Sequence, residues 1–291
     1  MLDTTPLHPR YGLRVHDVQL VDITAEQGYP EIRRAFEEHS LLHFPDQLLN
    51  DAGHLRLGAL FGPWEDRSLR PDQPNPAVSL VSNVREDGRV CQEGDRRLLD
   101  LQSNMLWHTD STFLPVPALA NLLVARVVPP SGTATEFTSS RIAWEEMPEA
   151  LQDRARNLYF RHDYTYSRRK VDSALAEEEK FTHWGQQVWK SVWTNPVNGR
   201  EALYIASHAC GVVGMPNPDA LALIDELTRW CTREQYVYAH QWKEGDVLIW
   251  DERAILHRGV PWNYREARTL SSICISATSE DGLDKMRYPS Q

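Results

Sequence analysis

The chain of 291 residues is poor in cysteine and has no long apolar run. Its four cysteines are far apart and form no C-x-x-C pair, so we expect reduced structural thiols rather than a disulfide framework. No apolar run approaches the ~18 residues of a membrane span. The N-terminus, MLDTTPLHPR, has acid and proline where a secretory signal needs a basic start and an apolar stretch. These absences predict a cytoplasmic protein with no membrane partner.

The sequence also lacks an excess of positive charge. Its 31 Lys and Arg residues against 41 Asp and Glu residues give a formal net charge of −10, and no strong basic run interrupts this acidity. Proteins bind a phosphate backbone mainly through Lys and Arg, so no nucleic-acid partner is expected. Hydrophobic residues make up 41% and charged residues 25%, which is typical of soluble globular proteins. Because the sequence has neither an internal repeat nor a low-complexity linker, we expect one domain over residues 1–291.

Apolar patterning predicts strands around the later motifs, with helices between them and at the ends. Residues at about 161–190 are polar and poorly periodic, which indicates a long lid or substrate loop. Gly245-Asp246 is predicted to form a tight turn. We expect strands at residues 41–44, 119–128, 203–207, 236–242, 246–250 and 269–277, and helices at 31–40, from near Asp51, at 140–158 and at 219–231, the last capped by Asp219.

Two widely separated segments contain residues suited to bind one metal ion. His108 and Asp110 form an H-x-D pattern, and His257 follows far downstream. Alternate side chains of a strand point to the same side, so His108 and Asp110 can converge on one ion. Two imidazoles and one carboxylate can occupy one face of Fe(II) and leave the other face open for a co-substrate and O2. The alternative is a strand-edge histidine beside a hydrogen-bonded aspartate, because H-x-D alone arises often by chance.

An arginine strengthens the metal interpretation. Arg268 lies eleven residues after His257, from where its guanidinium could hold a second anionic group near the metal. A guanidinium offers a carboxylate two parallel hydrogen bonds, whereas lysine does not. The alternative for Arg268 is a structural ion pair with an acidic neighbour such as Glu266.

Several segments together resemble the taurine dioxygenase / 2,4-dichlorophenoxyacetate dioxygenase (TauD/TfdA) family of Fe(II)- and 2-oxoglutarate-dependent oxygenases. The likeness runs in the right order over most of the chain and is most like the phenoxyalkanoate-degrading branch. It implies a mainly β fold with flanking helices and a double-stranded β-helix (jelly-roll) core, which brings distant strands together at one mouth. The segments are HPRYGLRVHDVQL (8–20), FPDQLLN (44–50), SNVREDGRV (82–90), WHTDSTF (107–113), VVPPSGTATEF (127–137), AHQWKEGDVLIWD (239–251), WDERAILHRG (250–259) and EARTL (266–270).

The resemblance implies a role for individual residues of this chain. The alternatives of an ordinary strand residue for Thr135 and a turn residue for Asn104 remain open. The implied residues are His108, Asp110 and His257 for the iron, Arg268 and Thr135 for the distal carboxylate of 2-oxoglutarate, and Asn104 beside the co-substrate.

Three positions depart from the family pattern. Glu252 replaces an asparagine after Trp-Asp, which we expect to alter a contact behind the metal rather than the metal itself. Gly211 replaces a second pocket histidine of the phenoxyacetate branch, although His208 is kept. Ser272 replaces an arginine that grips the sulfonate or carboxylate of the substrate in well-known members. This last change argues against both taurine and phenoxyacetate as substrates.

The substrate anion must therefore be bound by another residue. His208 can line the pocket or simply pack, and the run Arg168-Arg169-Lys170 can be a solvated group of charges on the lid. The candidate substrate residues are His208, Arg168, Arg169 and Arg85, with Arg258 as a further possibility.

The predicted function is an Fe(II)- and 2-oxoglutarate-dependent dioxygenase that hydroxylates a small organic acid, with or without an aromatic ring. The reaction would release succinate and CO2, and the product would fragment if the hydroxylated carbon bears an ether, amine or sulfonate. Family members are commonly oligomers, so a homo-oligomer is expected. One alternative is a zinc-dependent hydrolase or isomerase on a similar β-barrel, which needs a metal-bound water and a general base. A non-catalytic metal-binding sensor is another.

Overall fold

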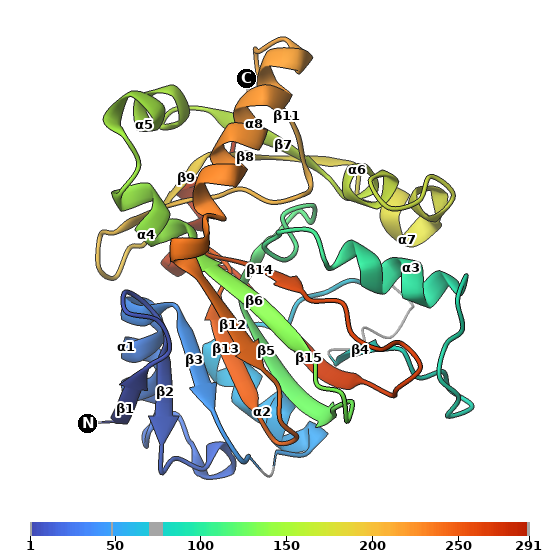
Figure 1. The fold of residues 1–291 in the computed structure, drawn as a ribbon. Helices are drawn as coiled ribbons and strands as arrows, with labels where there is room; N and C mark the ends of the chain where they lie inside the picture. Colours follow the sequence, from blue (N-terminus) through green and yellow to red (C-terminus); the bar gives the residue numbers. More distant parts are fainter. Residues whose placement is uncertain (1, 48, 70–77, 290–291) are drawn as a thin grey trace.

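A computed structural model of the chain describes residues 2–47, 49–69 and 78–289. Two facing sheets form its centre, a major sheet of order β1-β2-β3-β13-β5-β15-β4 and a minor sheet of order β12-β6-β14 (Figure 1). The major sheet contains β1 (Asp3–Pro6), β2 (Leu13–His16), β3 (Leu41–Phe44), β13 (Val247–Asp251), β5 (Ala118–Val127), β15 (Thr269–Ser276) and β4 (Ser79–Ser82). The minor sheet contains β12 (Val237–Gln241), β6 (Ala134–Ser139) and β14 (Ile255–Gly259).

Two smaller sheets and eight α-helices complete the described part of the chain. The smaller sheets are β11 (Ala209–Val212) with β7 (Tyr159–Asp163) and β8 (Gln186–Lys190), and β10 (Glu201–Leu203) with β9 (Val192–Thr194). The helices are α1 (Tyr29–His39), α2 (Asp51–Phe61), α3 (Arg96–Ser103), α4 (Ser140–Glu145), α5 (Glu149–Ala155), α6 (Tyr164–Arg169), α7 (Glu179–Thr182) and α8 (Asn217–Cys231). None of the helices described is long and apolar enough to cross a membrane.

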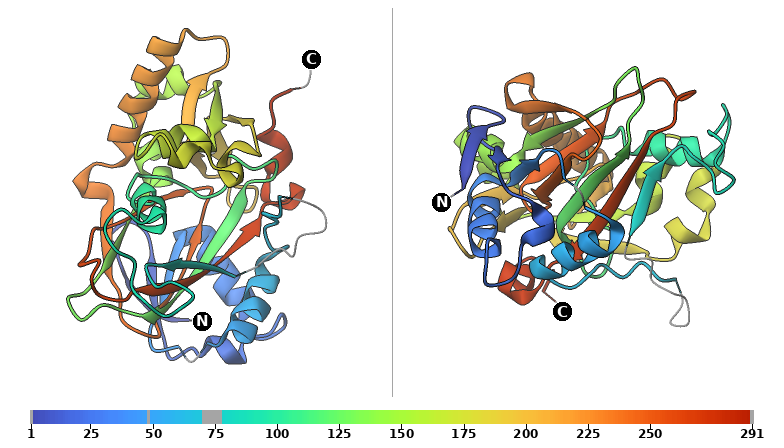
Figure 2. Two further views of the ribbon diagram at one scale, coloured as in Figure 1. Left: turned by 90° about the vertical axis from the view of Figure 1, so that its right-hand side faces the viewer. Right: turned by 90° about the horizontal axis from the view of Figure 1, so that it is seen from below.

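The strands of the major sheet are apolar on both faces because both faces are covered. In β13, Leu248 and Trp250 join a core cluster with Phe137 of the minor sheet, whereas Val247 and Ile249 pack on the other side with residues of α1 and α2. Alternate side chains of a strand point to opposite faces, so this division follows from the strand itself. Figure 2 shows the blue helices α1 and α2 against the major sheet. The expected fold, mainly β with flanking helices on a jelly-roll core, is confirmed.

Three expected elements differ from the structure. Residues 140–158 form two helices, α4 and α5, because Pro148 caps the second helix and its ring nitrogen has no hydrogen to donate inside a continuous one. The strand expected at 203–207 is β10, which ends at Leu203. Helix α8 begins at Asn217, two residues before the expected cap Asp219, since Pro216 already ends the preceding extended segment.

The segment predicted as a lid or substrate loop, 161–190, is a folded insert rather than a loop. It runs from β7 through α6 and α7 into β8, and Figure 1 shows α6 and α7 on the same side of the molecule as α3. Ion pairs between Lys180 and Asp100 (3.0 Å) and between Arg96 and Glu178 (2.9 Å) connect the insert to α3. The polar sequence of residues 161–190 therefore reflects short, partly exposed helices that ion pairs with α3 hold in place.

Candidate active site

The backbone brings the two predicted histidine ligands side by side. His108 and His257 form an isolated antiparallel bridge, in which each peptide N–H donates to the other residue's carbonyl oxygen at 3.0 and 2.8 Å. His257 lies in β14 of the minor sheet, and its ring centroid is 4.2 Å from that of His108. The closeness of the two imidazoles thus follows from strand pairing and not from side-chain rotation alone.

Asp110 completes a set of three donors that fits one metal ion. One ligand atom from each of His108, Asp110 and His257 lies within 4.8 Å of the others. The distances to the Asp110 carboxylate are 3.6 Å from His108 Nε2 and 3.9 Å from His257 Nε2. Burial and the neighbouring His108 lower the pKa of His257 to about 3, so its ring is neutral and has a lone pair for a metal. Two imidazoles and one carboxylate on one side of an ion are the ligand set of non-haem Fe(II) oxygenases.

Contacts behind the ligands fix their orientation. His108 Nδ1 lies 2.7 Å from the carbonyl oxygen of Leu106, so a proton on Nδ1 leaves Nε2 free to bind the metal. The side-chain amide of Asn121 donates to Asp110 Oδ2 at 2.7 Å, and the Ser272 hydroxyl donates to the Asn121 carbonyl oxygen at 2.9 Å. Ser272 therefore supports a metal ligand through Asn121.

Glu252 contacts the H-x-D segment from behind. Its carboxyl group accepts hydrogen bonds from the Thr109 hydroxyl (2.6 Å) and from the peptide N–H of Asp110 (2.8 Å). Burial and the charge of Asp110 raise the pKa of Glu252 well above its usual range. Its position agrees with the expectation of a contact behind the metal.

Arg268 is a buried cation with no carboxylate partner among the described residues. The residue is 4% exposed, its guanidinium lies 4.7 Å from the ring centroid of Trp262, and its Nε has no hydrogen-bond partner in the described chain. Burial lowers its pKa to about 10. Glu266 is not its partner, because that carboxylate accepts from Ser131 (2.6 Å) and Asn263 (2.9 Å) instead. A buried charge is costly unless it is paired, so a carboxylate from a bound molecule fits this position.

Thr135 is prepared to donate a hydrogen bond to the same carboxylate. Its Oγ1 accepts from the indole N–H of Trp242 at 2.9 Å, so the hydroxyl proton of Thr135 remains available. Thr135 lies in β6, beside the strand that carries His257. Asn104 caps the end of α3, and its carbonyl oxygen accepts from the peptide N–H of Gly259 at 2.8 Å. The residues thus fit both a metal ion and a dicarboxylate co-substrate.

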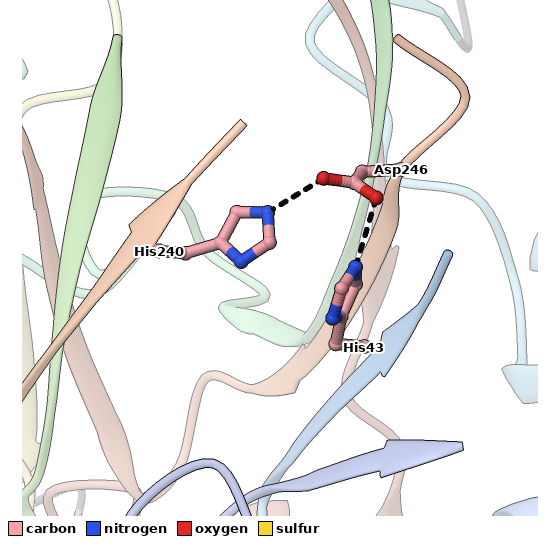
Figure 3. Close-up of side chains that lie close together, drawn as sticks. All are labelled: His43, His240 and Asp246. Carbon is pink, nitrogen blue, oxygen red and sulfur yellow. Dashed lines mark hydrogen bonds and ion pairs between the residues drawn. The ribbon is translucent and has the colours of Figure 1, made fainter. Parts of the chain in front are cut away.

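A second cluster, made of His43, His240 and Asp246, is closed by its own hydrogen bonds (Figure 3). Asp246 accepts from His43 Nε2 at 2.9 Å through one oxygen and from His240 Nε2 at 3.1 Å through the other. The ring of His240 packs edge-on against that of Trp242, with centroids 4.7 Å apart. The cluster joins β3, β12 and the start of β13. The Nε2 atoms of His43 and His240 are both hydrogen-bonded to Asp246. We interpret it as a structural junction.

One cavity of about 630 Å³ contains most of the predicted site residues. It is also lined by aromatic rings and by cations of the folded insert. The predicted residues that line it are Asn104, His108, Asp110, Thr135, Arg168, His208, His257 and Arg268.

Three candidates for the substrate anion lie outside this cavity. Arg85 pairs with Asp95 at the surface and borders a separate shallow hollow. Arg169 is exposed and pairs with Glu177 at 3.2 Å. Arg258 pairs with Glu136 at 2.6 Å. Each guanidinium pairs with its own carboxylate, and none of the three residues lines the cavity, so they are poorly placed to bind a substrate there.

Sequence reasoning missed Asn121, Arg67 and Asp100. Arg67 lines the cavity, pairs with Glu65 and donates to the Ser111 hydroxyl at 3.1 Å. Asp100 lies on α3 beside the cations of the insert. Only Asn121 left a signal, since it is the one polar side chain in the apolar run LANLLVA.

Comparison with known proteins shows the same family along nearly the whole chain. Residues 3–274 match the family described as "Taurine catabolism dioxygenase TauD, TfdA family". The alpha-ketoglutarate-dependent 2,4-dichlorophenoxyacetate dioxygenase of Cupriavidus pinatubonensis is 33% identical over 271 residues, 91% of this chain and 94% of that protein. The (S)-phenoxypropionate/alpha-ketoglutarate-dioxygenase of Sphingobium herbicidovorans is 31% identical and covers 97% of this chain and 98% of its own length.

A solved structure agrees with these sequence relatives. The crystal structure of AAD-2 in complex with Mn(II) and N-oxalylglycine superposes with a TM-score of 0.89 and is 28% identical, covering 96% of this chain and 98% of that one. These relatives support the oxygenase prediction and give no support to the hydrolase or sensor alternatives. The chain therefore belongs to the taurine catabolism dioxygenase TauD, TfdA family, and it is a 2-oxoglutarate-dependent dioxygenase.

Proposed function

We propose that this dioxygenase uses Fe(II) bound by His108, Asp110 and His257 to hydroxylate a small organic acid. The observation that carries the proposal is the presence, in one cavity, of a two-histidine, one-carboxylate cluster and a buried arginine without a carboxylate partner among the described residues. A metal ion alone would explain the cluster but not the arginine. A metal ion together with an anionic co-substrate explains both features.

The residues have separate tasks in this reaction. His108, Asp110 and His257 hold the metal from one side, and Asn121 keeps the Asp110 carboxylate turned toward it. Arg268 and Thr135 bind the distal carboxylate of 2-oxoglutarate, which fixes the orientation of the co-substrate at the metal. With both bound, the site supplies the oxidation by which 2-oxoglutarate and O2 become succinate and CO2 while one oxygen atom enters a substrate C–H bond.

A small aromatic acid agrees best with the cavity and with the relatives. Phe113, Tyr164, Phe181 and Trp184 line the cavity on the side of the insert and offer flat apolar surfaces to a ring. Relatives at 33% and 31% identity are named for 2,4-dichlorophenoxyacetate and (S)-phenoxypropionate. We propose an aryloxyalkanoate or a similar acid as substrate, in which hydroxylation next to an ether oxygen would break the molecule.

The first test is substrate-stimulated formation of succinate. Anaerobically purified protein would receive Fe(II), 2-oxoglutarate and ascorbate, then O2 and one member of a panel of phenoxyacetates, phenoxypropionates, N-acyl amino acids and sulfonates. We expect at least one acid to stimulate succinate formation and O2 uptake. Arg268→Ala should abolish both effects, and Arg169→Ala, a change at an exposed arginine outside the cavity, should leave them unchanged. Failure of 2-oxoglutarate to perturb the spectrum of the Fe(II) protein would refute the proposal.

We further propose that the enzyme works in the cytoplasm as a homo-oligomer. The four cysteines are all free thiols in the structure, which suits a reducing compartment. Light scattering of the purified protein at several concentrations gives the oligomeric state directly. A mass equal to one chain at every concentration would contradict this part of the proposal.

A further inference from the structure

The resemblance to the family implies an arginine for the substrate anion at position 272, and this chain has a serine there. Ser272 lies in β15 and is buried, and its hydroxyl donates a hydrogen bond to the side-chain oxygen of Asn121 at 2.9 Å. A serine in this arrangement cannot neutralise a carboxylate. If the substrate is an organic acid, its charge must be met by another residue of the cavity.

Most cations of the cavity already have a carboxylate or carbonyl partner, or another task. Arg67 pairs with Glu65, and Arg97 donates to the carbonyl oxygen of Val84. Arg96 is 69% exposed and Lys180 is 47% exposed, so solvent screens both charges. Arg268 is assigned to the co-substrate. Arg168 remains.

Arg168 combines deep burial with incomplete pairing. The residue is 5% exposed, and among the described residues its guanidinium donates hydrogen bonds only to neutral oxygens, the Tyr164 hydroxyl at 3.0 Å and the Ser167 hydroxyl at 3.2 Å. Its Nε has no hydrogen-bond partner within the described chain. The nearest carboxylate oxygen, Asp100 Oδ1, is 3.4 Å away, and the other oxygen of Asp100 is held by Lys180 at 3.0 Å. Lys180 also pairs with Glu178 at 3.5 Å, and Glu178 pairs with Arg96 at 2.9 Å. Three cations of this cluster thus share two carboxylates, which leaves a net positive charge for a ligand.

The guanidinium is held rigidly before any ligand arrives. It lies 4.3 Å from the ring centroid of Tyr164 and 4.9 Å from that of Phe181. The Tyr164 ring is itself stacked on Phe113, with centroids 3.5 Å apart. A side chain held in this way loses little further freedom on binding, so more of the interaction energy appears as affinity.

The neighbouring His208 does not compete for the same anion. Its Nδ1 lies 2.8 Å from the Ser167 oxygen, and the Ser167 hydroxyl donates to the Tyr164 carbonyl oxygen at 2.9 Å. The ring must therefore donate its proton through Nδ1, which leaves a lone pair on Nε2. Burial and the charge of Arg168 lower the pKa of His208 well below its usual value, so the ring stays neutral. A lone pair repels a carboxylate, and His208 is left to pack between Arg168 and His108, whose ring centroid is 6.4 Å from its own.

We propose that Arg168, from the folded insert, binds the carboxylate of the substrate in place of the arginine that Ser272 replaces. This inference rests on the proposed function and names the residue that makes an organic acid the preferred substrate. Asp100 then acts as the competitor of the substrate, because it occupies part of the guanidinium when the cavity has no acid in it.

The test separates acid recognition from the rest of the site. Binding of 2,4-dichlorophenoxyacetate, (S)-2-phenoxypropionate and their neutral amides would be measured anaerobically by calorimetry, with Mn(II) and 2-oxoglutarate bound. A hydrogen bond to a charged group corresponds to a change in affinity of about 10- to 100-fold. We expect Arg168→Gln to weaken binding of the preferred acid by that factor and to leave binding of its amide nearly unchanged. Asp100→Asn should tighten binding of the acid, since it removes the competing carboxylate.

The controls distinguish failure of this inference from failure of the proposed function. Arg168→Lys keeps the charge without the fork and should bind the acid between wild type and Arg168→Gln. Arg169→Ala removes the adjacent exposed arginine and should bind like wild type. Binding of 2-oxoglutarate to the Arg168 variants should remain intact, which also shows that they fold. If 2-oxoglutarate binds but Arg168→Gln binds acid and amide as wild type does, or if wild type prefers neither acid over its amide, the inference is wrong.

Discussion

The polar side chains of Asn121 in β5 and Ser272 in β15 support one proposed metal ligand, Asp110. Asn121 touches Asp110 directly, and Ser272 fixes which end of the Asn121 amide faces it. Hydrogen bonds behind metal ligands orient them and tune their affinity for the ion. The position at which the resemblance implies a substrate-binding arginine is thus occupied by a serine that supports the proposed metal site.

At this scale we predict that Asn121→Ala weakens metal binding about 10- to 100-fold, because the Asp110 carboxylate is then free to turn. Anaerobic titration with Fe(II) or Mn(II) measures the change. Ser272→Ala should have a smaller effect in the same direction. Ser271→Ala is the matched control, since the Ser271 hydroxyl lies next to Arg126 and not Asn121. Unaltered metal affinity in Asn121→Ala would contradict the prediction.

The three residues proposed as metal ligands, and Arg268, could be predicted because their spacing is a property of the sequence. The role of Asn121 could not, because it depends on which residues β5 and β15 place opposite one another. Arg168 was one of four candidates in the sequence, and only its burial distinguishes it from the exposed Arg169. Sequence reasoning thus reaches the residue types of a site before it reaches their directions.

Among the elements, the strands β3, β12 and β13 are joined by the junction of His43, Asp246 and His240. Burial opposes ionisation of Asp246, but the hydrogen bonds from His240 and His43 outweigh it and lower its pKa well below the usual value. A carboxylate with a lowered folded-state pKa stabilises the fold fully above the unfolded pKa, roughly 3.9 for aspartate. This contribution is lost as the pH falls toward the folded-state pKa.

We predict that Asp246→Asn lowers the free energy of unfolding at pH 7 by about 1.5–3 kcal/mol, the range for hydrogen bonds to a charged group. The difference between variant and wild type should shrink below about pH 4. Urea unfolding at a series of pH values measures both effects. Glu244→Gln, at an exposed position near the same turn, should follow the wild type throughout. A difference that stays constant with pH would show that the charge of Asp246 is not the cause.

Helices α1 and α2 and the buried strands were predictable because their apolar spacing matches the faces that they bury. The insert of residues 161–190 was not, since its short helices are stabilised by partners far along the chain. Phe113 stacks on Tyr164, and Asp100 pairs with Lys180. No local sequence pattern predicts either contact. The break at Pro148 could have been anticipated from proline's missing donor.

For the whole molecule, the buried charge of Arg268, which has no carboxylate partner among the described residues, should destabilise the fold until the co-substrate binds. We predict that Arg268→Met raises the free energy of unfolding of the ligand-free protein by about 1–3 kcal/mol, because it replaces a buried unpaired cation by an apolar side chain. Thermal unfolding with and without Mn(II) and 2-oxoglutarate measures this. In wild type, 2-oxoglutarate at 100 times its dissociation constant should add about 2.7 kcal/mol.

The same co-substrate should add almost nothing to Arg268→Met. Thr135→Val is a milder comparison, since it removes one hydrogen bond and leaves the cation in place. A ligand-free Arg268→Met protein that is less stable than wild type would mean that Arg268 already has a stabilising role in the fold.

The backbone bridge between His108 and His257 makes the proposed metal site depend on contact between two distant parts of the chain. The peptide groups of the two histidines hold one another, and they lie on segments that are widely separated along the chain. Contacts of such long range form only after the entropy cost of closing a long loop is met. A chain in which this bridge has not formed holds the H-x-D pair apart from His257, so it offers a metal ion only two of the three proposed ligands together. A metal ion that binds all three residues would therefore favour the folded chain over the unfolded one, because only the folded chain presents the complete set.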